Sequence, residues 1–233
     1  MNGSLLKNIN RQNDPDSILI NVPKYLFFDK GEYMRKKIRF FKQHTMETCG
    51  AACILMILDL YRKVEYPTQK QEMKLYSLYR SKAFKGVNAA AIANCLSRNG
   101  LAVHMIHSST KLMDNRDGYF SEELYDALVE EFRSEKEKCE EKIQLTAGTE
   151  ITCADLRREL DSGRQIILQC IVPGNADGMH DHVLHWIVVY GYEEDEFWVC
   201  DPLSSKIRIR EDALENYMDT PIGRICVVTG EKI

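Results

Sequence analysis

Residues 43–61, QHTMETCGAACILMILDLY, join a short polar segment to a continuous apolar run, with a cysteine at the junction. The run after Cys49 is rich in helix formers, and its apolar side chains recur at helical spacing. Cys49 would therefore lie in the first helical turn, where unpaired N–H groups and the positive end of the helix dipole favour a thiolate. The stretch predicts a helix over about 49–63 that begins with a nucleophilic cysteine.

Gln43 lies six residues before this cysteine. Its side-chain amide is a neutral hydrogen-bond donor. A charged donor at this position would compete for the thiolate, whereas an amide would not. Together with the backbone N–H of Cys49 it is expected to hold an oxyanion, a contribution of about 3–4 kcal/mol to lowering a reaction barrier.

Two strand-like runs near the C-terminus supply a histidine and a carboxylate. HWIVVYGY (185–192) and FWVCD (197–201) are rich in β-branched and aromatic residues, and four acidic residues separate them, which predicts an antiparallel hairpin. The midpoint between His185 and Asp201 is position 193, about one residue from the expected apex, so the two side chains should lie near each other. Asp201 would then fix the histidine tautomer that leaves the other ring nitrogen facing Cys49.

Other residues near this set have alternative interpretations. His180 and His182 would share a face of an extended strand and are a possible metal pair. A polar loop at the rim of a cleft is the preferred interpretation, with His182 as the fallback base. Cys53 recurs one turn after Cys49 but has no matching Cys/His pair at zinc-finger spacing, so we predict no metal and no cofactor.

The motifs in this order resemble the C39-like branch of the papain-fold cysteine peptidases. The resemblance covers roughly residues 38–228 and rests on four segments: QHTMETCGAA (43–52), GVNAAAIANCLSRNGL (86–101), HWIVVYG (185–191) and Asp201-Pro202. It implies a papain-like fold in which Gln43 completes the oxyanion hole, Cys49 is the nucleophile, His185 is the base and Asp201 orients the histidine. Thr48 departs from the pattern, because members of that family often carry Asp before the cysteine.

Residues 108–150 form an insertion relative to the peptidases that are attached to transporters. Its pattern is more similar to a standalone, guanylyl-cyclase-like branch of the C39-like group. A phosphate-cradling glycine loop and paired metal-binding carboxylates do not stand out, so cyclase activity is the least favoured hypothesis. The mixed-charge helix of the insertion predicts a helical flap beside the catalytic cleft that selects substrates.

The remaining pattern predicts an α+β fold, with helices first and antiparallel strands later. Outside the insertion, helices are expected at about 69–82, 88–98, 152–161 and 211–217, and strands at 101–106, 165–172, 183–192, 196–201, 206–210 and 223–229. The cysteine helix would pack on the sheet that carries His185 and Asp201. In residues 38–41, IRFF, Ile38 and Phe40 alternate with Arg39 and Phe41, which predicts a half-buried edge strand. This interpretation is preferred to a surface that binds phosphate or acidic lipid.

Length and composition predict one catalytic domain, 38–233, after an N-terminal extension, 1–37. A chain of 233 residues with 44% hydrophobic content can bury a sizeable core, and its net charge of −4 argues against broad affinity for nucleic acid. An apolar run of the about 20 residues needed to span a bilayer is not found, and the polar N-terminus lacks a signal pattern. Eight cysteines in apolar settings suit reduced thiols, so a cytoplasmic protein is expected. The oligomeric state is left open.

The function predicted from these residues is a cysteine peptidase or related hydrolase that acts on a peptide or protein. The same triad would also serve an acyltransferase or transpeptidase, and a non-catalytic binding module that kept the fold is a further alternative. The expected substrate contacts flank the nucleophile and the base in the sequence: Thr48, Gly50, His182 and Trp186.

Overall fold

The computed structural model describes residues 38–111, 113–138, 143–173 and 182–231. The expected N-terminal extension, residues 1–37, lies outside the described residues. The elements in chain order are α2 (Cys49–Leu60), α3 (Gln69–Tyr79), α4 (Ala89–Arg98), β1 (Leu101–His107), η1 (Arg116–Gly118), α5 (Glu122–Glu137), β2 (Ile143–Ala147), α6 (Cys153–Asp161), β3 (Gln165–Pro173), β4 (His182–Glu193), β5 (Glu196–Cys200), β6 (Lys206–Arg210), α7 (Glu211–Met218) and β7 (Ile225–Glu231).

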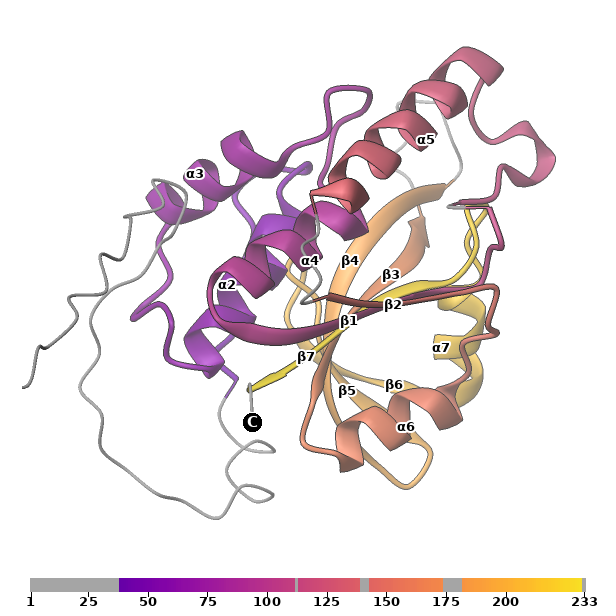
Figure 1. Ribbon diagram of the computed structural model, residues 1–233. Coiled ribbons are helices and arrows are strands. Elements are labelled where there is room, and N and C mark those ends of the chain that lie inside the picture. Colours follow the sequence, from indigo (N-terminus) through magenta and orange to yellow (C-terminus); the bar gives the residue numbers. More distant parts are fainter. Residues whose placement is uncertain (1–37, 112, 139–142, 174–181, 232–233) are drawn as a thin grey trace, which may run out of the picture.

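One seven-stranded sheet, in the order β2-β1-β7-β3-β4-β5-β6, organises the molecule (Figure 1). The β1–β2 pair is parallel and every other pair is antiparallel. Helices α2 to α5 lie on one side of the sheet, and α6 and α7 lie on the other. The α+β class and the packing of the cysteine helix on the sheet are as the sequence predicts.

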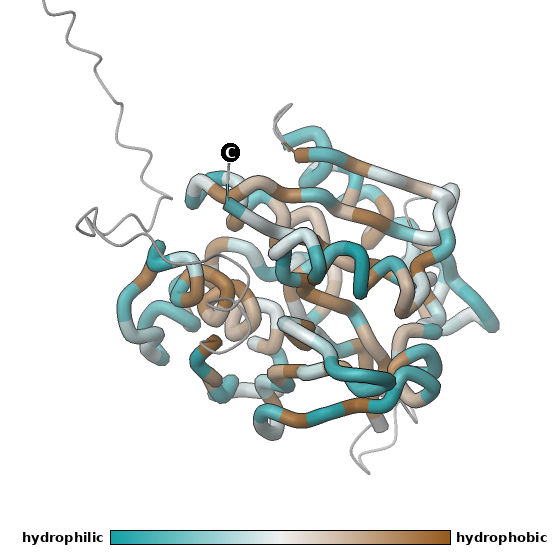
Figure 2. The backbone as a smooth tube through the Cα atoms, turned by 90° about the horizontal axis from the view of Figure 1, so that it is seen from below, coloured by the Kyte–Doolittle hydropathy of each residue, from teal (hydrophilic) through white to brown (hydrophobic). Residues whose placement is uncertain are grey.

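The central strands are apolar on both faces because each face is covered by helices. In β4, Trp186 and Val188 belong to the core under α2 to α5, whereas Ile187 and Val189 belong to the core under α6 and α7. This alternation follows from the two-residue period of a strand. The hydropathy of the tube in Figure 2 agrees: brown, apolar segments run through the interior and teal segments lie mainly at the periphery.

Helix α2 is the central helix of the larger core. All twelve of its residues are buried, including Asp59, so it is buried all round, beyond the single stripe that the sequence predicted. Asp59 accepts two hydrogen bonds from the Arg39 guanidinium, at 2.8 and 2.7 Å. Burying a carboxylate without such a partner would cost several kcal/mol, roughly. The pair fixes the incoming chain on α2.

The predicted edge strand at residues 38–41 is wrong. These residues belong to no strand, although Ile38 is buried as expected. The Arg39–Asp59 ion pair and the burial of Ile38 position this backbone. Neither contact can be predicted from strand periodicity.

Local signals place the next helices. Thr68 and Gln71 form a reciprocal capping box at the start of α3, and the Asn88 side chain caps α4 by accepting from the N–H of Ala91 at 2.9 Å. Helix α4 ends before Gly100, whose positive φ of 85° starts the turn into β1.

The expectation that the helix of residues 108–150 is a solvated cover rather than a core element is also wrong, whereas the role of this segment in substrate selection stays a prediction. In α5, Leu128 and Phe132 are almost fully buried in the larger core. Strand β2 pairs in parallel with β1, from Val103 opposite Ile143 to His107 opposite Ala147. The segment therefore supplies an edge strand and part of the core, because its helix carries an apolar stripe under its charged face.

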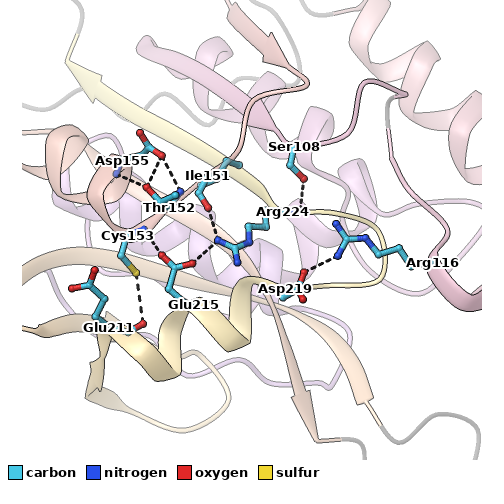
Figure 3. A network of polar contacts seen from close by, with 10 residues as sticks. All are labelled: Ser108, Arg116, Ile151, Thr152, Cys153, Asp155, Glu211, Glu215, Asp219 and Arg224. Atoms are coloured by element: carbon cyan, nitrogen blue, oxygen red, sulfur yellow. Dashed lines mark hydrogen bonds and ion pairs between the residues drawn. The ribbon is translucent and has the colours of Figure 1, made fainter.

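Polar contacts also fix the segments that lead into and out of this region (Figure 3). The Arg224 guanidinium donates to the Ile151 carbonyl at 2.7 Å and pairs with Glu215 of α7. The backbone N–H of Arg224 donates to the Ser108 hydroxyl at 2.9 Å. These contacts hold the residues that flank the predicted insertion against β7 and α7.

Candidate active site

Cys49 is the first residue of α2, as the sequence predicts. Its N-cap residue, Thr48, makes no side-chain capping bond, and the first turn contains no acidic residue. The N–H groups of that turn are therefore not neutralised by a capping side chain, and the helix dipole is unopposed there by a carboxylate. Both features favour negative charge at this end of α2, on a thiolate or an oxyanion.

His185 contacts Asp201 and lies near enough to Cys49 for the two side chains to act on each other. Its Nε2 is 2.8 Å from Asp201 Oδ1, and the nearby Cys49 and Asp201 side chains both raise the pKa of its ring. With Nε2 held by the carboxylate, Nδ1 is the ring nitrogen left for the thiol. The structure thus brings together the predicted nucleophile, base and orienting carboxylate.

The environment of His185 favours its charged form. Burial alone would lower the pKa, but the hydrogen bond with Asp201 and the nearby Cys49 and Asp201 side chains raise the pKa of His185 to about 9. A histidine with that pKa is an imidazolium at neutral pH. An adjacent imidazolium stabilises a thiolate, so the pair is suited to nucleophilic attack.

Asp201 is held in place by the turn that follows β5. Its carboxylate accepts from the backbone N–H of Leu203 at 2.9 Å and from the hydroxyl of Ser204 at 2.8 Å. Burial would raise the pKa of Asp201, but hydrogen bonds from His185, Ser204 and Leu203 lower it. The carboxylate is therefore ionised and oriented toward the ring. The sequence analysis missed Ser204, although a serine three residues after an aspartate is a common turn signal.

Gln43 is joined to the same turn. Its backbone N–H donates to the Pro202 carbonyl at 2.9 Å, which ties the segment before α2 to the residue after Asp201. Its side-chain Nε2 donates to the Thr45 carbonyl at 2.8 Å, and its side chain is buried. The amide carries a second N–H, which is the donor available to an oxyanion.

The residue after Gln43 is anchored by a buried carboxylate that the sequence analysis did not identify. Glu72 is fully buried and accepts from the backbone N–H of His44 at 3.0 Å, and its other oxygen lies 2.5 Å from His44 Nδ1. The two residues are 28 positions apart, so no local pattern relates them. This contact fixes the loop that carries Gln43.

Of the four predicted substrate contacts, three lie in packed positions. Thr48 is fully buried, and its hydroxyl donates to the Thr45 carbonyl at 3.0 Å. The Trp186 ring is buried and donates to the Val87 carbonyl at 2.8 Å, so this residue packs under the site. A side chain at Gly50 would meet Val87 Cβ at 3.0 Å and Trp186 Cδ1 at 3.3 Å, which explains the glycine. The side chain of the fourth, His182, lies outside the described residues, as does His180.

Exposed apolar side chains flank the site instead. Met46 lies in the Gln43 loop and Val183 lies two residues before His185, and they are 56% and 44% exposed. Surface hydrophobes beside a reactive centre suit contact with an apolar part of a ligand.

The other thiols near the site are in different environments. Cys53 is fully buried and donates to the Trp186 carbonyl, consistent with a core role. Burial raises the pKa of Cys53 and of Cys170 well above the usual range, so both remain thiols at neutral pH. Among the described residues the cysteines are free, and none of their clusters with His, Asp or Glu is arranged to hold a metal ion. Within the same residues, no helix combines the length and apolar character needed to cross a bilayer.

Comparisons with known proteins identify a matching family and several similar solved structures. The sequence model of the Peptidase_C39 like family matches residues 38–224. One similar solved structure is a double glycine motif protease from an AMS/PCAT transporter in complex with the leader peptide, with 16% identity over 85% of this chain and 94% of that chain and a TM-score of 0.43. Another is the peptidase domain of Streptococcus ComA, a bi-functional ABC transporter, with 14% identity over 84% of this chain and 100% of that chain and a TM-score of 0.45. A search of curated proteins finds no match.

Proposed function

Because the chain belongs to the Peptidase_C39 like family, we propose that it is a cysteine peptidase that cleaves a peptide or protein substrate with Cys49, His185, Asp201 and Gln43. The observation that supports this most is the position of His185, which hydrogen-bonds with Asp201 and lies near Cys49, the first residue of α2.

In the proposed reaction the Cys49 thiolate attacks the scissile carbonyl carbon. The backbone N–H of Cys49 and the free N–H of the Gln43 amide stabilise the negative charge that develops on the carbonyl oxygen. His185 Nδ1 then gives its proton to the leaving amine, the C–N bond breaks, and a thioester remains on Cys49.

Water completes the cycle. His185 Nδ1 accepts a proton from the attacking water, the C–S bond breaks, and the carboxylic acid product and the Cys49 thiolate are released. Asp201 accepts a hydrogen bond from Nε2 throughout, so the ring keeps its orientation in both halves of the reaction. An amine in place of water would give acyl transfer through the same thioester.

Met46 and Val183 are proposed substrate contacts, because they are the exposed hydrophobes of the two segments that carry Gln43 and His185. Met46→Ser should raise KM for a preferred peptide several-fold, roughly, with little change in kcat, since a uniform binding contact does not act on the chemical step. A fall in kcat at unchanged KM would contradict this role.

The reactivity of Cys49 tests the proposal. The full chain is treated with iodoacetamide at pH 7, and the modification rate of each cysteine is followed by mass spectrometry. Cys49 should react fastest, and His185→Ala should slow its reaction, whereas Cys53 should stay unmodified in the folded protein. If Cys49 reacts no faster than the buried thiols, the non-catalytic alternative is correct.

The substrate is identified by incubation with a mixture of synthetic peptides. Cleavage should disappear in Cys49→Ala and persist in Cys53→Ala, the matched removal of a thiol one turn further along α2. Rapid acid quenching and mass analysis should capture a thioester on Cys49. Added hydroxylamine or an amino-acid amide then shows whether water or an amine is the preferred acceptor.

A further inference from the structure

A pocket lies between the end of β1, helix α5 and β2. It is a cavity of about 500 Å³, within the range of about 300–1,000 Å³ typical of small-molecule sites. Strand β1 and the residues after it supply His107, Thr110 and Lys111, α5 supplies one face, and Ala147 of β2 completes the wall. Most of the lining therefore lies on regular secondary structure, and Thr110 and Lys111 lie in the loop after β1.

His107 is the unusual group in this pocket. It is 1% exposed, its ring packs edge-on against Phe132, and neither ring nitrogen has a partner at hydrogen-bond geometry among the described residues, although the Ser109 carbonyl lies near the ring. Leaving both nitrogens of a buried imidazole unsatisfied costs roughly 1–3 kcal/mol for each group. An unsatisfied buried polar group that lines a cavity indicates a position where a ligand supplies the missing partner.

Three other lining residues are cationic. Arg133 and Lys136 project from α5 at the spacing of one helix face, and Lys111 follows the end of β1. Asp126 is the carboxylate among the lining residues, so three positive charges oppose one negative charge in a chain whose net charge is −4.

The pairing of Arg133 does not remove it from the pocket. Arg133 makes an ion pair with Glu130, and both side chains are more than half exposed. Such exposed pairs contribute little, about 0–1 kcal/mol, so the guanidinium can exchange this partner for a ligand at small cost.

We propose that this pocket binds a small organic oxyanion, with Lys111, Arg133 and Lys136 neutralising its phosphate or carboxylate and His107 hydrogen-bonding to it. Arg and Lys together suit such groups, since a guanidinium binds an oxyanion with two parallel hydrogen bonds and an ammonium adds a compact charge. Neutral imidazole can donate through one nitrogen and accept through the other, which suits a ligand that also carries a hydroxyl.

The binding test uses the full chain with three probes at constant ionic strength: inorganic phosphate, pyrophosphate and citrate. Isothermal titration calorimetry should detect saturable binding of at least one probe. The double variant Arg133→Gln/Lys136→Gln should weaken that binding by about tenfold or more, as expected for lost charge-assisted bonds. Preference for pyrophosphate over citrate identifies a phosphate ligand, and the reverse order identifies a carboxylate.

The matched control is Lys138→Gln, which removes a positive charge from the same end of α5 without altering the lining. Its affinity for the probe should be unchanged. The proposal is overturned if none of the three probes binds, or if Lys138→Gln weakens binding as much as the Arg133→Gln/Lys136→Gln variant does, because the effect would then be general electrostatic attraction.

A second readout follows His107 directly. In ¹H–¹⁵N spectra of the histidine rings, the bound probe should shift the His107 signals and raise the pH at which they titrate, while those of His104, on the same strand, stay unchanged. Saturable binding without any change at His107 would contradict its role as a contact. Because the variants lie outside the active site, failure of this proposal is separable from failure of the peptidase proposal, which depends on Cys49.

Discussion

The surroundings of two buried histidines on one sheet differ in a way that explains the chemistry of each. His185 and His107 are 4% and 1% exposed, so both have lost most of their contact with water. His185 hydrogen-bonds with Asp201 and lies near Cys49, and its pKa is raised to about 9. Burial lowers the pKa of His107, despite the nearby carbonyl of Ser109 and the carboxylate of Asp114, and the charge of Lys136 lowers it further.

Burial therefore does not decide the charge of a histidine in this protein. The penalty for burying a charged ring acts on both residues, and the acidic partners of His185 outweigh it. One region presents a charged acid–base group to a thiol, whereas the other presents a neutral ring to a cationic pocket.

The largest predicted effect comes from His185 itself. His185→Asn should lower kcat by at least about 10³-fold on the preferred peptide, because the variant has no group to move the proton. His104→Asn, on β1 of the same sheet, is the matched control and should retain activity. Steady-state kinetics measures both, and near-normal turnover by the His185 variant would show that another base, such as His182, acts instead.

Gln43 is expected to contribute the next largest effect. Gln43→Ala should lower kcat by about 10²–10³-fold and leave KM nearly unchanged, since an oxyanion donor acts mainly in the transition state. Because the Gln43 backbone bond with Pro202 does not depend on the side chain, the loop should remain in place. A change confined to KM would remove Gln43 from the proposed oxyanion hole.

Substitution of Asp201 tests why the pKa values of His185 and His107 differ. The pKa of His185 is raised from 6.5 to about 9, so its proton is fully bound below pH 6.5 and is lost as the pH rises through about 9. The alkaline limb of kcat/KM should therefore lie near pH 9. Asp201→Asn should move this limb to lower pH by about one unit or more, because the charged partner is gone.

The same titration should leave His107 unaffected. Histidine NMR should show that the His107 signals still titrate below 6.5 in the Asp201 variant, which makes His107 an internal reference. An unchanged alkaline limb in Asp201→Asn would mean that a group other than His185 sets it.

The smallest predicted effect concerns positioning. Glu72→Gln keeps the shape of the side chain but removes the charge that holds His44, so the Gln43 loop should become less well fixed. We expect kcat to fall by about tenfold, with KM unchanged, since a small displacement of an oxyanion donor affects the transition state most. Glu65→Gln, an exposed carboxylate of the same chain, is the control. A loss of thermal stability large enough to account for the loss of activity would indicate that Glu72 has a purely structural role.

The comparison also separates what could be predicted from the sequence at each site. The start of α2 at Cys49, the hairpin of β4 and β5, and the caps Thr68, Asn88 and Thr152 follow from local patterns, and all are present in the structure. The predicted roles of the site residues remain proposals, but their proximity follows from the hairpin and from the family pattern.

The errors have physical causes too. Strand β2 was missed because five residues after a charged run give a weak periodic signal, and its parallel pairing with β1 is set by tertiary structure. The flap was predicted from the charges of α5, although Leu124, Leu128 and Phe132 recur at i, i+4 and i+8 and indicate a buried face. Weighting that apolar stripe above the charges would have given the correct assignment.

The sequence by itself determined the family pattern, the helix that begins at Cys49 and the strand that carries His185, because propensity, capping and periodicity act between near neighbours. Only the tertiary structure decided that the pKa of His185 is raised while that of His107 is lowered, that Glu72 holds the Gln43 loop, and that β2 pairs in parallel with β1. Those properties depend on burial and on groups far apart in the chain, and a partner's distance in space is not encoded in its distance along the sequence.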